Sequence, residues 1–281
     1  MFPSSSVTRL YLADTLKRRY PELFSRLLSL LHANDIPTGI IQNTRDVWCR
    51  DYMPVQVGDK RFVGFTYFPD YLRPRRCRHL ITGPETWKSI GHIRKCAESD
   101  IVLDGGNIVH WRDTAILTDK IFRENPRYAQ RRLLARLAEL LEINRVITIP
   151  VEPGDVVGHA DGVLRFVDEH TVLLNRYAGT LAEYGREVKK ILKRHHINWL
   201  EFPYAVSNRS RNGIPSAEGN YVNFLHVKGL LILPLYDLPN DEAAFRAAET
   251  AFPSTVIKTV ACRKLAKNGG VLNCVSWGIA E

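Results

Sequence analysis

The chain has 281 residues, 45% of them hydrophobic and 25% charged, which predicts a large buried core and excludes an intrinsically disordered protein. Its net charge of +9 would attract polyanions, but the basic residues gather at 73–78 and on expected helical faces, without the aromatic residues of a base-stacking platform. We therefore expect this charge to solvate the surface, and we expect no nucleic-acid partner.

The predicted elements repeat in one order from residue 104 onward. Strands at 108–111 and 114–118 form a hairpin, a helix at 131–141 carries leucines at three- and four-residue steps, and a buried strand follows at 145–150. The same order returns twice more: strands at 162–167 and 171–175, a helix at 181–195 and a strand at 198–202, then strands at 221–227 and 230–235, a helix at 241–251 and a strand at 255–260. Each unit is therefore expected to have the order ββαβ.

The chain shows no Pro-, Ser- or Gly-rich linker and no shift in composition, so we expect a single domain over residues 1–281. A ring of ββαβ units encloses a core and leaves no exposed sheet edge. No apolar run approaches ~20 residues, and the first residues lack the pattern of a signal peptide, which predicts a cytoplasmic protein without a membrane partner. The five cysteines are scattered and odd in number, which predicts reduced thiols.

Five short motifs recur along the chain at nearly equal steps. Their markers are Asp51, Asp104, His159, Asn220 and Cys274, which lie 53, 55, 61 and 54 residues apart. The motifs themselves are Trp48-Cys49-Arg50-Asp51, Asp104-Gly105-Gly106-Asn107, Gly158-His159-Ala160-Asp161, Glu218-Gly219-Asn220-Tyr221 and Gly269-Gly270-Val271-Leu272-Asn273-Cys274. We expect five similar units, each placing one hairpin turn at a shared centre. The turns would bring together three carboxylates, an imidazole and a thiol, which are the groups needed for covalent attack on a bound cation.

These motifs resemble those of the agmatine deiminase and bacterial peptidylarginine deiminase family of guanidino-group modifying enzymes. The resemblance runs from about residue 36 to the end: W-x-R-D-x-x-P is matched at 48–54, [ED]-G-G-N at 104–107 and G-H-x-D-x-x-x-R-F at 158–166, and glycines precede Cys274. It implies an α/β fold of pentein type, a five-bladed propeller of pseudo-symmetric ββαβ units. It also implies hydrolysis of a guanidinium group to a ureido product and ammonia, without a cofactor.

The chain departs from the family pattern at three places. Asn273 stands immediately before Cys274 where agmatine deiminases usually have histidine, and Val275-Ser276-Trp277 follow where they have glutamines. Asp104 stands where many members carry glutamate. The nucleophile itself remains, so the resemblance leaves agmatine, arginine and peptidyl arginine open as substrates.

The chemistry of a guanidinium group suggests a role for each polar motif residue. Carboxylates match its forked N–H groups, so Asp51 and Asp161 are expected to hold two sides of the group and leave its central carbon open to attack. Cys274 would attack as a thiolate, its pKa lowered by the cationic substrate and by a nearby imidazole, and form a covalent amidino-thioether. His159 would protonate the departing ammonia and then activate water, and Asp104 would orient the imidazole.

Other motif residues have two interpretations. Trp48 is expected either in the core or on the apolar wall of a substrate channel. Asn107 either contacts the substrate or caps its turn. A lone histidine among scattered acids, without a second His or Cys at ligand spacing, predicts no metal site.

The residues that recognise the far end of the substrate are the least determined. A long polar loop at 206–216 carries Arg209 and Arg211, which would pair with a substrate carboxylate and favour arginine or an arginine peptide over agmatine; a solvated surface loop is the alternative. Two other functions stay open: an amidinotransferase, in which an amine resolves the thioether, and a non-enzymatic basic propeller that binds RNA or protein. The sequence also leaves open whether the chain forms a homo-oligomer.

Overall fold

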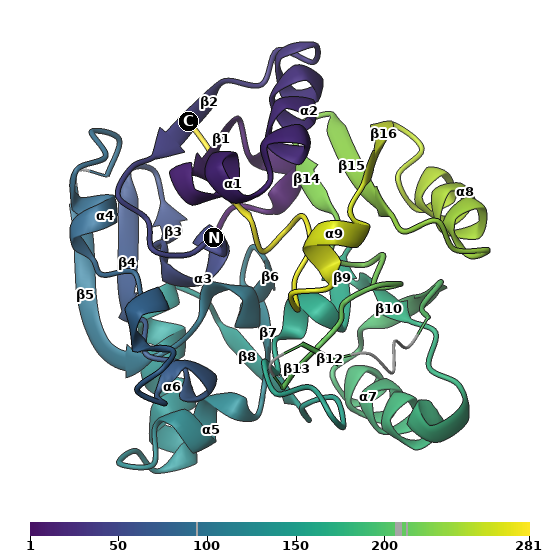
Figure 1. Cartoon of the computed structure of the whole chain (residues 1–281). Coiled ribbons are helices and arrows are strands. Elements are labelled where there is room, and N and C mark those ends of the chain that lie inside the picture. Colours follow the sequence, from purple (N-terminus) through teal and green to yellow (C-terminus); the bar gives the residue numbers. More distant parts are fainter. Residues whose placement is uncertain (94, 206–209, 212) are drawn as a thin grey trace.

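The computed structural model of the chain describes residues 1–93, 95–205, 210–211 and 213–281. Within these residues the strands form five three-stranded sheets and one two-stranded sheet. Figure 1 shows the sheets set around a common centre, with the longer helices α2, α6, α7 and α8 on the outside. The chain therefore has an α/β fold built from several small sheets.

The strands are β1 (Arg9–Ala13), β2 (Thr38–Ile41), β3 (Val55–Gly58), β4 (Arg61–Thr66), β5 (Lys95–Val102), β6 (Val109–Trp111), β7 (Thr114–Thr118), β8 (Arg145–Ile149), β9 (Leu164–Phe166), β10 (Thr171–Asn175), β11 (Asn198–Phe202), β12 (Ser210–Arg211), β13 (Ile214–Pro215), β14 (Leu225–Val227), β15 (Leu230–Leu235), β16 (Val256–Ala261) and β17 (Ser276–Ile279). The helices are α1 (Asp14–Arg19), α2 (Pro21–His32), α3 (Cys49–Tyr52), α4 (Glu85–Lys88), α5 (Lys120–Glu124), α6 (Gln130–Leu141), α7 (Ala182–Arg194), α8 (Asp241–Ala251) and α9 (Arg263–Ala266). Short 3-10 turns are η1 (Ser4–Ser6), η2 (Asp70–Leu72), η3 (Arg78–Leu80), η4 (Gly105–Asn107), η5 (Ala160–Gly162) and η6 (Gly179–Leu181).

Each three-stranded sheet has the same pairing. Its middle strand is antiparallel to one neighbour and parallel to the other, as in β6-β7-β8, β9-β10-β11 and β14-β15-β16. A parallel pair needs a crossover connection, and α6, α7 and α8 supply it in these sheets. In α6, Leu133, Leu137 and Leu141 are buried at four-residue steps, which is the predicted packing stripe.

The first and last strands of the chain belong to one sheet. β17 pairs antiparallel with β1, with Arg9 opposite Ile279, and β2 completes the sheet on the other side of β1. The resemblance in the sequence began only near residue 36, so it omitted β1, the middle strand of this sheet. The pairing satisfies the backbone groups along one side of β17.

The motif turns differ from the sequence prediction in one respect. Three of the five predicted turns are short helical turns, at α3, η4 and η5, rather than hairpin turns. The predicted strand at 221–227 is also shorter, because only Leu225–Val227 pairs as β14, and the carbonyl of Asn223 accepts a hydrogen bond from the Asn273 amide instead. Strands 114–118, 171–175, 198–202 and 230–235 and the helix 241–251 were predicted with the bounds that the structure has.

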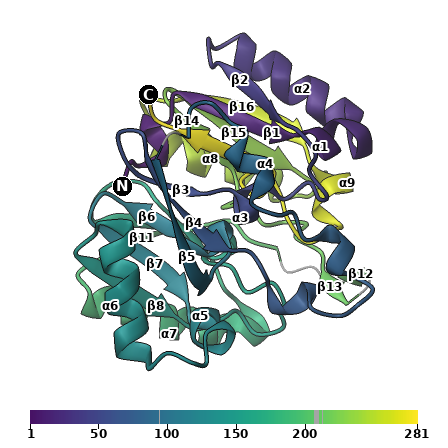
Figure 2. The same cartoon turned by 90° about the vertical axis from the view of Figure 1, so that its left-hand side faces the viewer.

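The molecule has two distinct ends along the axis of the ring. In Figure 2 the chain's N-terminus lies at one side of the molecule and the β12–β13 hairpin at the opposite side.

Among the described helices, none is long and apolar enough to cross a membrane.

Candidate active site

A cavity of roughly 370 Å³ lies between the motif turns and the β12–β13 hairpin. We call it the main cavity. Its lining includes His159 and Asp161 from the η5 turn, Asn223 before β14, and Gly270 and Cys274 from the C-terminal turn. Segments that are far apart in the chain thus supply one concave surface, which is where a small ligand is usually bound.

His159 is held by a carboxylate near each ring nitrogen. Its Nε2 lies 2.8 Å from Oδ2 of Asp104, and its Nδ1 lies 3.5 Å from Oδ1 of Asp51. The ring of Tyr71 packs edge-on against the imidazole at 6.4 Å between centroids. The side chains of His159, Asp104 and Asp51 are all buried, so water does little to screen the charges that they carry.

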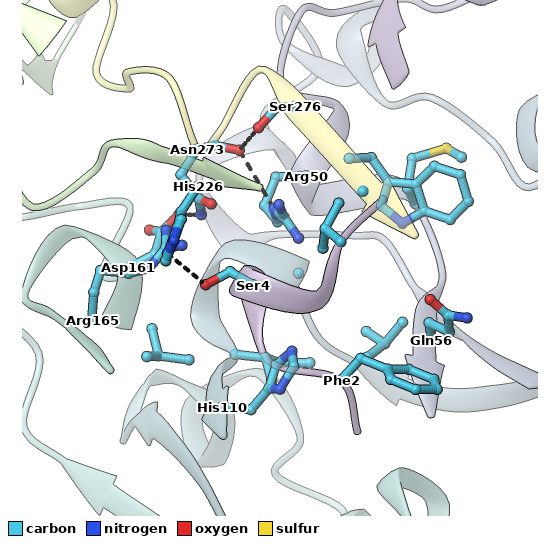
Figure 3. Close-up of a pocket in the computed structure, with 18 of the residues that line it drawn as sticks. Phe2, Ser4, Arg50, Gln56, His110, Asp161, Arg165, His226, Asn273 and Ser276 are labelled. Carbon is cyan, nitrogen blue, oxygen red and sulfur yellow. Dashed lines mark hydrogen bonds between the residues drawn. The ribbon is translucent and has the colours of Figure 1, made fainter. Parts of the chain in front are cut away.

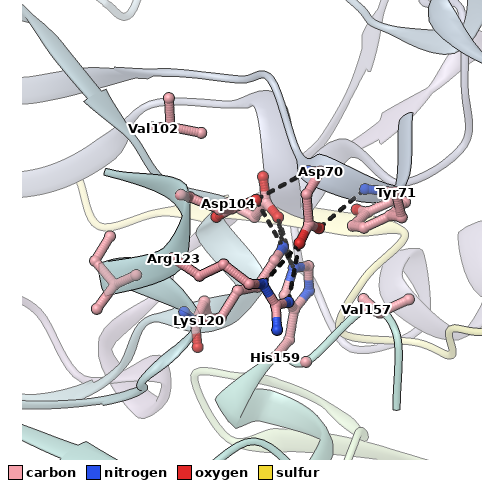
Figure 4. Close-up of polar contacts among 12 residues, drawn as sticks. Asp70, Tyr71, Val102, Asp104, Lys120, Arg123, Val157 and His159 are labelled. Carbon is pink, nitrogen blue, oxygen red and sulfur yellow. Dashed lines mark hydrogen bonds and ion pairs between the residues drawn. The ribbon is translucent and has the colours of Figure 1, made fainter. Parts of the chain in front are cut away.

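A buried lysine extends this network behind Asp104 (Figure 4). Lys120 Nζ lies 2.5 Å from Oδ2 of Asp104, 3.3 Å from Oε1 of Glu124 and 3.4 Å from Nε2 of His159. Sequence reasoning missed Lys120, whose only signal was a charged residue two positions after the apolar strand β7. A buried cation beside two carboxylates compensates part of their charge, and Lys120 therefore keeps Asp104 ionised next to the imidazole.

Gly106 lies at the point where three functional side chains converge. Its amide donates a 2.9 Å hydrogen bond to Oδ1 of Asp51. A methyl group at Gly106 would lie 2.7 Å from Asp51 Oδ1, 2.7 Å from His159 Nδ1 and 3.3 Å from Asp161 Oδ2. Glycine is needed here because any side chain would occupy the space between these groups.

The Cys274 thiol contacts Asp161 and Asn223. Its Sγ is 3.7 Å from Asp161 Oδ2 and 3.5 Å from Asn223 Oδ1. Asn273 donates a 2.6 Å hydrogen bond to the same Asp161 oxygen, and its own amide N–H donates to Asn223 Oδ1 at 3.2 Å. Asn223 was not predicted: the motif marker was Asn220, whose side chain instead donates to the carbonyl of Gly162 at 2.9 Å.

The charges around the imidazole shift its protonation state. Burial alone would lower the pKa of His159, but the carboxylates of Asp51 and Asp104 outweigh burial and the charge of Lys120 and raise this pKa to about 9. Burial likewise opposes ionisation of Asp104, yet Lys120 and His159 bring its pKa down to about 2. At neutral pH the imidazole is therefore protonated and Asp104 is ionised.

The pKa values of Asp51 and of the Cys274 thiol are both raised, so their uncharged forms are favoured. Burial, together with the charges of Asp104 and Asp161, raises the pKa of Asp51 to about 7 against the opposing influence of His159. Burial, and then the charges of Asp161 and Asp51, raise the pKa of the Cys274 thiol well above its usual range. Both shifts would be reversed by a cation bound between the carboxylates.

The remaining predicted site residues lie behind or away from the main cavity. The Trp48 ring packs directly against Gly270, where a methyl group would come within 2.6 Å of it, and it contacts the hydrophobic core. Asn107 ties the turns together: its Oδ1 accepts hydrogen bonds from the Thr118 amide at 2.9 Å and the Ala160 amide at 3.2 Å. Trp48 and Asn107 thus support the turns that carry the site.

Of the two arginines predicted to recognise the substrate's far end, the structure describes only Arg211. Arg209 lies outside the described residues. Arg211, on β12, is exposed, donates to Asn268 Oδ1 at 3.2 Å and is not part of the cavity lining.

Within the described residues no group of three or more His, Cys, Asp or Glu side chains is arranged to hold a metal ion. All five cysteines are free thiols. The candidate site is thus a cluster of two acid-flanked reactive groups, the Cys274 thiol and the His159 imidazolium, on either side of Asp161 and Gly106.

The fold and the sequence of the chain are similar to those of known proteins. Over its full length the structure is similar to the agmatine deiminase of Enterococcus faecalis, with a TM-score of 0.81 and 17% identity across 100% of this chain and 95% of that one. It is similarly close to the C. jejuni agmatine deiminase, with a TM-score of 0.80, 18% identity and the same coverage. The agmatine deiminase of Pseudomonas aeruginosa is 25% identical over 277 residues, which span 82% of this chain and 73% of that protein. Residues 16–279 match the model of the Porphyromonas-type peptidyl-arginine deiminase family, and the chain belongs to that family.

Proposed function

We propose that the protein hydrolyses the guanidinium group of a small substrate to a ureido product and ammonia, through a covalent intermediate on Cys274. The observation that carries this proposal is the convergence of Asp51, Asp161 and His159 around Gly106, with the Cys274 thiol 3.7 Å from Asp161. A planar cation with forked N–H donors fits between two such carboxylates. Membership in a deiminase family supports the same reaction.

The substrate itself would activate the nucleophile. Without a ligand, two carboxylates and burial keep Cys274 protonated. A guanidinium bound by Asp51 and Asp161 compensates their charge, which lowers the thiol pKa and releases its proton to solvent. The thiolate then attacks the central guanidinium carbon, held within contact distance by the carboxylates.

His159 would then serve each half of the reaction. The imidazolium donates its proton to the departing nitrogen, so that the C–N bond breaks with release of ammonia and a thiouronium remains on sulfur. The neutral imidazole next takes a proton from a water molecule that attacks the same carbon. The C–S bond then breaks, the remaining hydroxyl proton leaves to solvent, the ureido product is released and the Cys274 thiolate is regenerated.

The part of the main cavity beyond these groups is acidic. Its described lining residues include Glu152 and Asp155 besides Asp161, and no lysine or arginine. Glu218 also lines it, but this carboxylate is paired with Arg263 at 2.9 Å. Glu152 accepts hydrogen bonds from Tyr204 and another tyrosine, and burial raises its pKa to about 7. A substrate tail that ends in an ammonium group is favoured here over one that ends in a carboxylate, so we propose an agmatine-type substrate rather than arginine.

The test compares agmatine, arginine and a peptide with C-terminal arginine, with ammonia and ureido product measured together. We expect equal amounts of both products and a kcat/KM for agmatine at least ~10-fold above that for arginine, the effect of one charge contact. Cys274→Ser should fold and show no turnover, while Cys262→Ser, at a buried thiol outside the cavity, should keep its activity. A preference for arginine would contradict the assignment of the tail.

A transferase outcome is distinguishable in the same assay. Ammonia released without ureido product, and only when an amine acceptor is present, would show that an amine resolves the intermediate. Intact-mass analysis after acid quenching should show a substrate-derived adduct on the wild type and none on Cys274→Ser. Absence of any adduct and of any product would refute the proposed chemistry.

A further inference from the structure

A second cavity, of about 90 Å³, lies on the other side of the motif turns from the main cavity. We call it the inner cavity. It is enclosed by strands β3, β6, β9, β14 and β17 and closed by the N-terminal segment, including Phe2 and Ser4. Asp161 lines both cavities, so its side chain contacts both spaces. The proposed deimination makes no use of the inner cavity.

The inner cavity is lined by two buried or half-buried arginines. Arg50 and Arg165 both contribute to it, and Asp161 is the one carboxylate among its described lining residues. That carboxylate is already engaged by the Asn273 side chain at 2.6 Å. Burial and the charge of Arg50 lower the pKa of Arg165 to about 10, which shows that the two guanidinium groups repel each other.

The guanidinium groups have few acceptors in the protein. Each has one hydrogen bond in the described structure, from Arg50 Nε to the Asn273 carbonyl at 3.4 Å and from Arg165 Nη1 to the Phe224 carbonyl at 3.5 Å. A guanidinium offers five N–H donors. In Figure 3 the Arg50 guanidinium lies between Asn273, Ser4 and His110. Most of its donors therefore remain available to a ligand.

A histidine supplies an independent sign of an absent partner. His110 Nδ1 is buried and has no hydrogen-bond partner among the described residues. Burial and the charges of the N-terminal amine, Arg50 and Arg165 lower the pKa of His110 to about 3, so the ring is neutral and carries one N–H. An orphaned buried ring nitrogen is costly unless something in the cavity bonds to it.

We propose that the inner cavity binds a small inorganic anion between Arg50 and Arg165, with His110 as a further neutral donor. Two guanidinium forks match the oxygens of a tetrahedral oxyanion such as phosphate, and a halide fits the same donors as a point charge. The anion would offset the repulsion between the arginines. Asp161 opposes it, but the arginines leave an excess of one positive charge before the N-terminal amine is considered.

The position of Asp161 couples the two cavities. A cationic ligand in the main cavity would pair with Asp161 and leave the arginines less compensated, which favours the anion. By linkage the anion favours the cationic ligand equally. This coupling rests on the proposed function, whereas anion binding does not, so the first test measures binding alone.

The direct test uses crystals of the whole protein soaked in sodium bromide, with data collected at the bromine absorption edge. We expect an anomalous peak in the inner cavity, within ~3.5 Å of guanidinium nitrogens of Arg50 and Arg165. A cavity that contains only water at ~1 M bromide would overturn the proposal. No variant is needed, so this result does not depend on how a substitution folds.

The solution test measures thermal unfolding with sodium phosphate against a salt with a bulky anion at matched ionic strength. We expect the Tm of the wild type to rise by about 3–5 °C at saturating phosphate. Arg165→Gln should abolish the rise. Ser4→Asp should abolish it too, because it adds a carboxylate to the lining of the same cavity. Arg246→Gln, at an exposed arginine on α8 paired with Glu242, should keep it.

Each outcome of the solution test decides the proposal. A phosphate-dependent Tm that is lost in Ser4→Asp and kept in Arg246→Gln supports the site, even where Arg165→Gln does not fold. Equal stabilisation in all the folded variants would place the anion elsewhere and overturn the assignment. If agmatine is turned over, phosphate should lower its KM in the wild type and leave it unchanged in Ser4→Asp.

Discussion

Gly106→Ala tests whether the convergence of the acidic groups and the imidazole is the centre of the site. The new methyl group would lie 2.7 Å from Asp51 Oδ1 and from His159 Nδ1. Ordinary contact begins at 3.4 Å, so each group must retreat by about 0.7 Å. Neither group can do so freely, because both are buried and Asp51 is tied to the Gly106 amide itself.

The size of the effect follows from this displacement. A misplacement of ~1 Å in a group that positions the reacting atoms costs on the order of 10²-fold in rate, or about 2.7 kcal/mol in the activation free energy. The methyl group would also occupy the space in which we place the guanidinium. We therefore expect kcat/KM to fall by at least ~100-fold. If the methyl group blocks the cation, most of the loss should appear as weaker substrate binding and a higher KM. If it displaces His159, most of the loss should appear as a lower kcat.

The assay is steady-state release of ammonia and ureido product, with circular dichroism and thermal unfolding to confirm the fold. Gly162→Ala is the matched control: it lies on the same cavity, its new methyl group would meet only the Asn220 side chain at 3.4 Å, and it should change kcat/KM by less than ~3-fold. A folded Gly106→Ala enzyme with near-normal kcat/KM would show that the reacting group is bound elsewhere and would refute this reading of the site.

Three further predictions concern charge. Lys120→Met leaves buried Asp104 without its cation, so urea unfolding should show that the free energy of unfolding falls by about 3–5 kcal/mol. The control Lys189→Met, at a partly exposed ion pair, should lower it by less than ~1 kcal/mol. Equal losses would mean that Lys120 only fills space. Since the pKa of Asp51 is raised to about 7 and its ionised form is the one that binds a cation, kcat/KM should rise as pH increases through about 7, and pH profiles of Asp51→Asn should lack this limb. Glu152→Gln should raise the KM for agmatine by ~10-fold or more and leave a tail-less guanidine unaffected; equal changes for both would remove Glu152 from tail recognition.

The regular elements and the reactive residues were accessible from the sequence because both leave local patterns. Strand 230–235 is a continuous apolar run and helix 241–251 has a three- and four-residue apolar step, and each has the predicted bounds. The equal spacing of Asp104, His159 and Cys274 indicated units that share a centre, and the structure brings these residues to one region. Residue type and order therefore carried the fold class and the chemistry of the candidate site.

Contacts between distant segments were decided only by the tertiary structure. Nothing local to Lys120 or Asn223 shows that one lies against Asp104 and the other against Cys274, because such partners are separated by up to 51 residues. The pairing of β1 with β17 spans nearly the whole chain. A pKa likewise depends on burial and on every charge within a few ångströms, so the protonated imidazole and the raised pKa of Asp51 arise only in the folded chain. Folding also brings the two arginines of the inner cavity together.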